Sequence, residues 1–167
     1  KGKTDGSGIK VTTYNITYCT TGMYQNALAT AGIEDAEIVV AGPYNISGTA
    51  ALVGAIKSYE NMTGETVSQE NVDTATNELV VTGKLAESVG DSDKAEQLVG
   101  AVKEQVVEGS DNGKKLTEEE IGNVVDQAAQ EMDVQLSDED RQEIVDLMDK
   151  IKGLDIDVDS LKEQAKD

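Results

Sequence analysis

The sequence predicts an α+β fold, in which a small βαβ-type unit with parallel strands is followed by an acidic multi-helix region. Strand-like and helix-like segments alternate in the first part, and apolar residues recur at helical spacing in the second. The acidic residues are concentrated in the second part as well. These observations divide the chain into residues 1–8, a linker or cut end, residues 9–64, the βαβ-type unit, and residues 65–167, the helical region.

The composition is that of a folded chain with an aliphatic core. Of the 167 residues, 38% are apolar, which is enough for one domain or two small ones to bury a modest core. Aromatic residues make up only 3% of the chain and all of them are Tyr. The core must therefore be filled mainly by Val, Ile, Leu, Ala and Met.

The net charge of −19 is unevenly distributed. Residues 1–63 hold four Lys and five acidic residues, a net charge of −1, and residues 64–167 hold ten basic and twenty-eight acidic residues, a net charge of −18. Such a surface repels phosphate backbones and anionic lipid headgroups. The chain also has no apolar run long enough to span a bilayer. We therefore expect no nucleic acid partner and no direct membrane insertion.

The βαβ-type unit begins with a predicted strand over residues 8–18, where nearly every residue is β-branched or aromatic. A helix follows over residues 20–32, with Thr20 or Thr21 as its cap. The run AEIVVAGP, residues 36–43, is short, continuously apolar and ended by Gly-Pro, which indicates a buried strand. Strand, helix and strand in this order predict parallel strands, with functional groups favoured at their C-terminal ends.

A second helix is predicted after this strand, with Ser47 or Thr49 as its cap and Gly64 as its end. Two helix N-termini then lie near one edge of the sheet, a geometry that can bind an anion. The glycines match neither a Walker nor a dinucleotide fingerprint, so ordinary turn chemistry is the alternative. The candidate binding residues at these two junctions are Thr20, Thr21, Tyr44, Asn45, Ser47 and Thr49.

Capping residues predict where the helices of the second part begin and end. Ser68 opens the first of them and Gly90 closes it, and the next helix ends at Gly109. Thr117 and Glu120 have the spacing of a capping box, which opens a third helix. The further predicted starts are Asp91 or Ser92, Ser137, and Asp159 or Ser160.

Cys19 is the chain's one cysteine, and it lies between the first predicted strand and the first predicted helix. A thiol at a helix N-terminus can be activated, because the helix dipole and the unpaired N–H groups lower its pKa. A cysteine nucleophile also needs a base, and the chain has no His. Cys19 is therefore either a nucleophile served by a Lys or a carboxylate, or a small buried residue at a strand-to-helix junction.

The segment LDIDVDS places Asp155, Asp157 and Asp159 at alternate positions, as at the start of an EF-hand loop. The pattern departs from that loop at Ser160, where Gly is needed, and at Lys166, where a bidentate Glu is needed. Either the three aspartates bind calcium weakly, or the segment is extended with its aspartates turned to solvent.

A family resemblance is carried by the run GIKVTTYNITYCTTGMYQNALATAGIEDAEIVVAGPYNISGTAALVGAIKSYENMTGE, residues 8–65. It is similar to the central segment of the YpuA-like family, uncharacterised secreted or envelope-associated proteins of Gram-positive bacteria. The segments ELVVTGKLAESVGD and LDIDVDSLKEQAKD resemble the helical part of the same family. The resemblance implies a longer precursor with a signal peptide and an upstream segment, an extracellular or envelope location, and no established activity.

Three kinds of function remain open. We expect a non-enzymatic extracellular or envelope protein, a binding or scaffolding module without a cofactor, whose partner is an unknown protein or a cell-wall ligand. The first alternative is a thiol-dependent or anion-binding enzyme centred on Cys19 and the turn Pro43–Thr49. The second is a weak cation binder that uses the acidic helical half.

Overall fold

A computed structural model describes residues 6–111, 115–157 and 161 of the chain. Two strands and six helices are found in these residues. In chain order they are β1 (Ile9–Ile16), α1 (Thr21–Thr30), β2 (Ala36–Ile46), α2 (Ala51–Thr63), α3 (Gln69–Val89), α4 (Ser92–Asp111), α5 (Glu118–Glu131) and α6 (Asp138–Ile151). The α+β prediction is confirmed.

The two strands form a parallel pair joined by α1, which is the predicted βαβ unit. Their register places Ile9 opposite Ala36 and Tyr14 opposite Ala41, and a bulge then shifts the pairing. Asn15 sits at the bulge with a φ of 57°, and its side-chain amide donates to the Gly42 carbonyl oxygen at 2.8 Å. Asn tolerates this left-handed conformation better than a β-branched residue does.

The prediction that the second strand ends at residue 43 and is buried is wrong. β2 runs on through Pro43 to Ile46, and the side chain of Val39 in its middle is 62% exposed. Because the carbonyl of Gly42 is turned toward β1, the missing N–H of Pro43 falls on the other edge, where β1 needs no donor. α1 packs on one face of the strand pair, so the side chains on the other face remain exposed.

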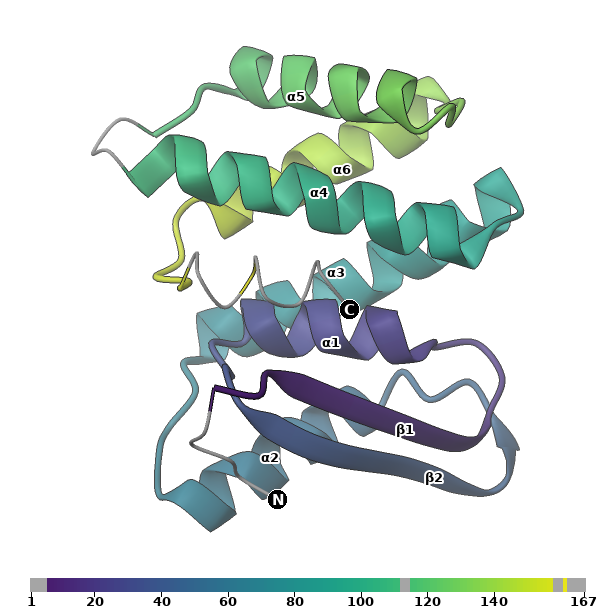
Figure 1. The fold of residues 1–167 in the computed structure, drawn as a ribbon, viewed down its shortest axis with the longest axis vertical. Helices are drawn as coiled ribbons and strands as arrows, with labels where there is room; N and C mark the ends of the chain where they lie inside the picture. The colour runs from purple at the N-terminus through teal and green to yellow at the C-terminus, as the bar shows by residue number, and fades with distance from the viewer. Residues whose placement is uncertain (1–5, 112–114, 158–160, 162–167) are drawn as a thin grey trace.

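α1 lies in the middle of the molecule, between the sheet and the helices of the second part (Figure 1). Thr20 is its N-cap, since the Thr20 hydroxyl accepts a hydrogen bond from the Met23 N–H at 3.1 Å. Its buried residues face the strands on one side and α3 and α4 on the other, which makes α1 the centre of the core. They are Met23, Tyr24, Ala27, Leu28, Ala29 and Thr30.

The prediction that Ser47 or Thr49 caps the second helix is wrong. α2 begins at Ala51 and its N-cap is Ala50, which makes no side-chain capping bond. Gly48 has a φ of +91° and its carbonyl accepts from the Ala51 N–H at 3.0 Å, so the chain turns at Gly48 before the helix begins.

The capping predictions for the second part are largely confirmed. Ser68 caps α3, Gly90 closes it in the left-handed conformation, and Thr117 forms a complete capping box with Glu120 at the start of α5. Gly109 does not end α4, which continues to Asp111. A Cβ atom at Gly109 would lie 3.0 Å from the Leu116 Cδ1, so this glycine lets Leu116, which lies between α4 and α5, pack closely against α4.

One hydrophobic cluster takes side chains from both the βαβ unit and the helical part. α3 contacts α1, α2, α4 and α6, and thereby joins the two parts. The division of the chain into three segments stays a prediction. The helix expected after Asp159 or Ser160 falls on residues of which only Leu161 is described.

Candidate functional site

The two strand-to-helix junctions lie side by side. The Cys19 N–H donates to the Ser47 carbonyl oxygen at 3.1 Å, and the Thr17 N–H donates to the Ile46 carbonyl oxygen at 2.9 Å. These bonds join the end of β1 to the end of β2, as expected for parallel strands whose C-terminal ends meet. The junctions therefore form one surface of the molecule.

Cys19 is buried within this surface, with 3% of the residue exposed. Its thiol hydrogen bonds with the hydroxyl of Tyr24, which is fully buried and donates to the Gly48 carbonyl oxygen at 2.5 Å. Burial raises the pKa of the Cys19 thiol above its usual value, and it also raises the pKa of Tyr24. A protonated and covered thiol favours the packing role of Cys19 over the nucleophilic one.

The hydroxyl of Thr20, besides capping α1, donates to the Glu96 carboxylate. The Ser47 and Thr49 hydroxyls lie 3.5 Å apart and are hydrogen bonded to each other. Of the other candidate binding residues, Thr21 and Asn45 are exposed and Tyr44 is 71% exposed. A binding role for this set stays a prediction.

Asp155 and Asp157 are exposed, and Asp159 lies outside the described residues. Between them Ile156 is 8% exposed, so the segment turns an apolar side chain inward. Within the described ranges, no three Asp, Glu or Cys side chains gather closely enough to hold a metal ion. In the same ranges, no helix is long and apolar enough to cross a membrane.

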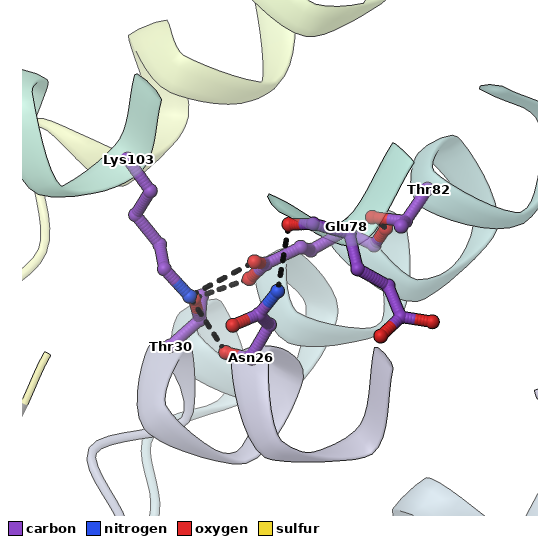
Figure 2. Close-up of polar contacts among 6 residues, drawn as sticks. Asn26, Thr30, Glu78, Thr82 and Lys103 are labelled. Atoms are coloured by element: carbon purple, nitrogen blue, oxygen red, sulfur yellow. Dashed lines mark hydrogen bonds and ion pairs between the residues drawn. The ribbon is translucent and has the colours of Figure 1, made fainter. Parts of the chain in front are cut away.

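A buried polar network joins α1, α3 and α4 (Figure 2). The Lys103 ammonium donates to the Glu78 Oε1 at 2.9 Å, to the Asn26 carbonyl oxygen at 2.8 Å and to the Thr30 hydroxyl at 3.3 Å. Thr30 donates to the other carboxylate oxygen of Glu78, and the Thr82 hydroxyl donates to the Glu78 carbonyl oxygen at 2.8 Å. Every group of this network thus has a partner, which favours a structural role.

This network was not predicted from the sequence, although the sequence contains a signal for it. Lys103 lies four residues after Val99 and three before Val106, on the predicted apolar stripe of its helix. Glu78 lies three residues after Ala75, on the apolar face of α3. A charged residue at core spacing in each of two helices indicates a buried pair.

A hollow of about 640 Å³ lies between α1 and α4, next to this network. Several of the polar side chains that line it already have hydrogen-bond partners. The Asn26 amide donates to the Glu96 carbonyl oxygen at 3.3 Å, and the Gln25 amide donates to the Ile9 carbonyl oxygen at 2.8 Å. Burial raises the pKa of Glu96, whose carboxylate accepts from Thr20. The contacts of Asn26 and Thr20 with Glu96 hold α1 against α4, and the contact of Gln25 with Ile9 holds α1 against β1.

A groove of about 480 Å³ lies between β2 and α2. Residues 36–41 of β2 form one wall. Because successive side chains of a strand point to opposite faces, a wall of consecutive residues indicates that the groove runs along the edge of β2. The wall on α2 is built largely from small side chains, with Tyr59 and Met62 toward its end. Its residues are Ala51, Gly54, Ala55, Ser58, Tyr59 and Met62.

The backbone of β2 presents alternate residues to this groove. The Ala36 N–H donates to the Gly8 carbonyl oxygen at 3.3 Å and the Gly42 carbonyl accepts from Asn15, so the even-numbered residues of this stretch face β1. The N–H and C=O groups of Val39 and Ala41 therefore point away from β1, along the outer edge of β2. No third strand pairs there in the part of the chain that the structure describes.

The groove also exposes apolar side chains in the near-neutral part of the chain. Val39 is 62% exposed and Met62 is 57% exposed. Residues 1–63 have a net charge of −1, and the acidic helix α5 lies at the end of the molecule opposite the sheet (Figure 1). The groove is the described surface that best combines an open strand edge with apolar contacts.

The whole chain, residues 1–167, matches the family described as "Protein of unknown function (DUF1002)". The chain belongs to this family. It is also 39% identical over 165 residues to "Uncharacterized protein YpuA" of Bacillus subtilis (strain 168), which confirms the resemblance to YpuA-like proteins. The match covers 97% of this chain and 56% of that relative, so the chain spans little more than half of the relative's length. No solved structure matches the chain.

Proposed function

We propose that this chain is a non-enzymatic binding or scaffolding module that binds an extended polypeptide segment along the outer edge of β2. The observation that carries the proposal is the groove beside α2, which is lined by Val39 and Ala41, whose backbone groups point away from β1. A segment laid in the groove pairs with these groups as a third strand, and its alternate side chains contact the small residues of α2.

The energetics favour such an addition. A two-stranded sheet is marginal by itself, and parallel strands are usually covered on both faces. Complete burial of a Val or Met side chain contributes about 1.5–3 kcal/mol, and the half-exposed Val39 and Met62 would each contribute part of that amount. The added strand also supplies partners for the edge of β2.

The ends of the open edge limit what can pair with it. Glu37 lies before Val39 and Pro43 lies after Ala41, and charged residues and prolines are typical of strand edges that resist uncontrolled pairing. The short open stretch between them favours one register for the added strand. A segment with basic residues outside the paired stretch is also attracted by the net charge of −19.

We place this role at the cell envelope or outside the cell, on the strength of the family resemblance. A binding or scaffolding role needs no catalytic group, which agrees with the covered thiol of Cys19.

The test uses the isotopically labelled chain and a designed peptide of about eight residues with Val and Lys at alternate positions. We expect binding to shift the amide resonances of Val39 and Ala41 and to slow their hydrogen exchange. A peptide with the backbone nitrogen of each Lys methylated is the matched control, because it keeps the Lys charges and has no N–H to donate at these positions. The proposal would be contradicted if the resonance shifts occurred at residues outside β2, or if the two peptides shifted the resonances of Val39 and Ala41 equally.

Two variants complete this test. Val39→Asp introduces a charge into the groove and is expected to abolish the shifts. Val80→Asp makes the same change at a 40% exposed valine on α3, outside the groove, and is expected to leave them intact. Circular dichroism and thermal melting of both variants check that each remains folded.

A further inference from the structure

We infer that the segment that fills the groove between β2 and α2 belongs to the same longer protein, and is the stretch that precedes residue 1 there. This inference rests on the proposed function, because it names the occupant of the same groove. Two observations carry it: the place where the chain enters the described fold, and the length of the relative.

The chain enters the fold at the beginning of β2. The N–H groups of Gly6 and Gly8 donate to the two carboxylate oxygens of Asp35, at 3.1 and 2.8 Å. Asp35 directly precedes Ala36, which is both the first residue of β2 and the first residue of the groove wall. Gly6 is thereby held next to the end of the groove.

A preceding strand can reach Gly6 from the groove by a short route. The positions on either side of β2 are two strand spacings apart, roughly 10 Å. β1 occupies one of these positions, and the groove is the other. A strand that arrives at Gly6 by this route runs antiparallel to β2.

The relative is long enough to hold such a segment. The matched region covers 56% of the Bacillus subtilis protein, so a large part of that protein lies outside the match. A segment in the same chain has an effective concentration of about millimolar, whereas a separate partner or a second copy also loses translational and rotational freedom. A groove with only a few residues of open edge therefore favours a tethered occupant.

The experiment adds synthetic peptides to the labelled 167-residue chain. Overlapping peptides cover the part of the Bacillus subtilis relative that lies outside the match, and each is added at millimolar concentration. We expect one peptide, or two that overlap, from the stretch that precedes the match to slow hydrogen exchange at Val39 and Ala41 at least tenfold, which corresponds to about 1.4 kcal/mol. The same effect from a peptide that follows the match would overturn the inference. Val39→Asp is expected to remove the effect, and Val80→Asp to keep it.

A second measurement uses the full-length relative. Its strand that corresponds to β2 is expected to exchange at least about tenfold more slowly than β2 of the present chain at its open edge. In one outcome the designed Val/Lys peptide binds, no peptide of the relative binds, and this strand exchanges freely in the full-length relative. The inference is then wrong and the proposed function stands. If nothing binds and the strand is open in the relative, both are wrong. Protection that rises with the concentration of the present chain alone identifies a second copy, and overturns the inference.

Discussion

The Nζ atom of Lys103 lies 2.9 Å from Oε1 of Glu78, and both side chains are only 1% exposed. Thr30 on α1 hydrogen bonds with both of them, so three helices meet at one ion pair. An ion pair in this setting loses the hydration of both charges, and its attraction offsets that loss only when the remaining donors and acceptors are also satisfied. The network therefore fixes how α1 lies on α3 and α4 more than it adds stability.

Removing one partner of this pair is expected to destabilise the fold strongly. Lys103→Met leaves the Glu78 carboxylate buried without its counter-ion, and such a change lowers the free energy of unfolding by about 3–5 kcal/mol. Urea denaturation followed by circular dichroism measures the change. The double variant Glu78→Leu with Lys103→Met removes both charges, and we expect it to be more stable than Lys103→Met alone.

Arg141 and Asp126 provide the matched control. They form an exposed ion pair between α6 and α5, with side chains 36% and 54% exposed. Arg141→Met is expected to lower the free energy of unfolding by less than about 1 kcal/mol, because solvent already screens the pair. Equal losses for Arg141→Met and Lys103→Met would contradict the role given to the buried network.

Cys19 is expected to be unreactive in the folded protein. Its thiol is covered and hydrogen bonded with Tyr24, and burial raises its pKa, so little thiolate forms at neutral pH. Iodoacetamide should label Cys19 only under conditions that unfold the chain, with a rate that follows the unfolded fraction. Fast labelling of Cys19 in the native chain at pH 7 would contradict this prediction and would support the hypothesis of a thiol-dependent enzyme.

Stability is expected to fall at alkaline pH. The fold raises the pKa of Cys19 above 9.0 and that of Tyr59 from 10.0 to about 12, and burial is the first cause in both cases. When the pKa of a group is higher in the folded state, its protonated form stabilises the fold. This stabilisation is fully present below the pKa of the unfolded chain and is lost as the pH rises through the pKa of the folded state. Unfolding free energies should therefore be level around neutral pH and decline above about pH 9. A Tyr59→Phe variant should lose part of this decline.

Many local features of this chain follow from short sequence signals. The caps Ser68 and Thr117 and the closing glycine Gly90 lie where they were predicted, because each bonds with backbone only a few residues away. The start of α2 differs from the predicted one because the turn at Gly48 depends on Tyr24, a residue distant in sequence. The Tyr24 hydroxyl donates a hydrogen bond to the Gly48 carbonyl oxygen. A short sequence pattern around residue 48 cannot predict that contact.

The groove between β2 and α2 likewise could not be predicted from local sequence patterns. The continuous apolar run of β2 predicted a strand covered on both faces, since it does not reveal how many strands or helices surround it. The tertiary arrangement of β2 and α2 decides that Val39 is exposed and lines the groove between them. The pairing of Glu78 with Lys103 across 25 residues depends likewise on how α3 packs against α4.

Glu96 should limit stability at neutral pH. Burial raises the pKa of its carboxyl group, so the fold favours the protonated form; that contribution is present at acidic pH and is lost as pH rises through the folded-state pKa. Glu96→Gln removes the charge and keeps an oxygen that accepts from Thr20. We expect this variant to melt at a higher temperature than the parent at pH 7, with a difference that shrinks toward acidic pH. If Glu96→Gln lowered the melting temperature equally at pH 7 and at acidic pH, Glu96 would not limit stability in the way predicted.

Gly54 allows the groove to be closed without disturbing the fold. It lies within α2 on the groove wall, and a Cβ atom added there meets no atom within 4 Å. Gly54→Ala should raise the free energy of unfolding by about 0.5–1 kcal/mol, because Ala is the better helix former and open space surrounds it.

Gly54→Phe adds a side chain large enough to occupy the groove from the same position. We expect it to stay folded, with a melting temperature no lower than that of the parent, and to lose binding of the designed Val/Lys peptide by at least about tenfold. Gly54→Ala should retain that binding, which makes it the matched control for Gly54→Phe. The comparison separates the groove from the helix that lines it, because both variants remove the same glycine and only one fills the space beside β2. Equal peptide affinity in the two variants would place the binding surface elsewhere on the chain.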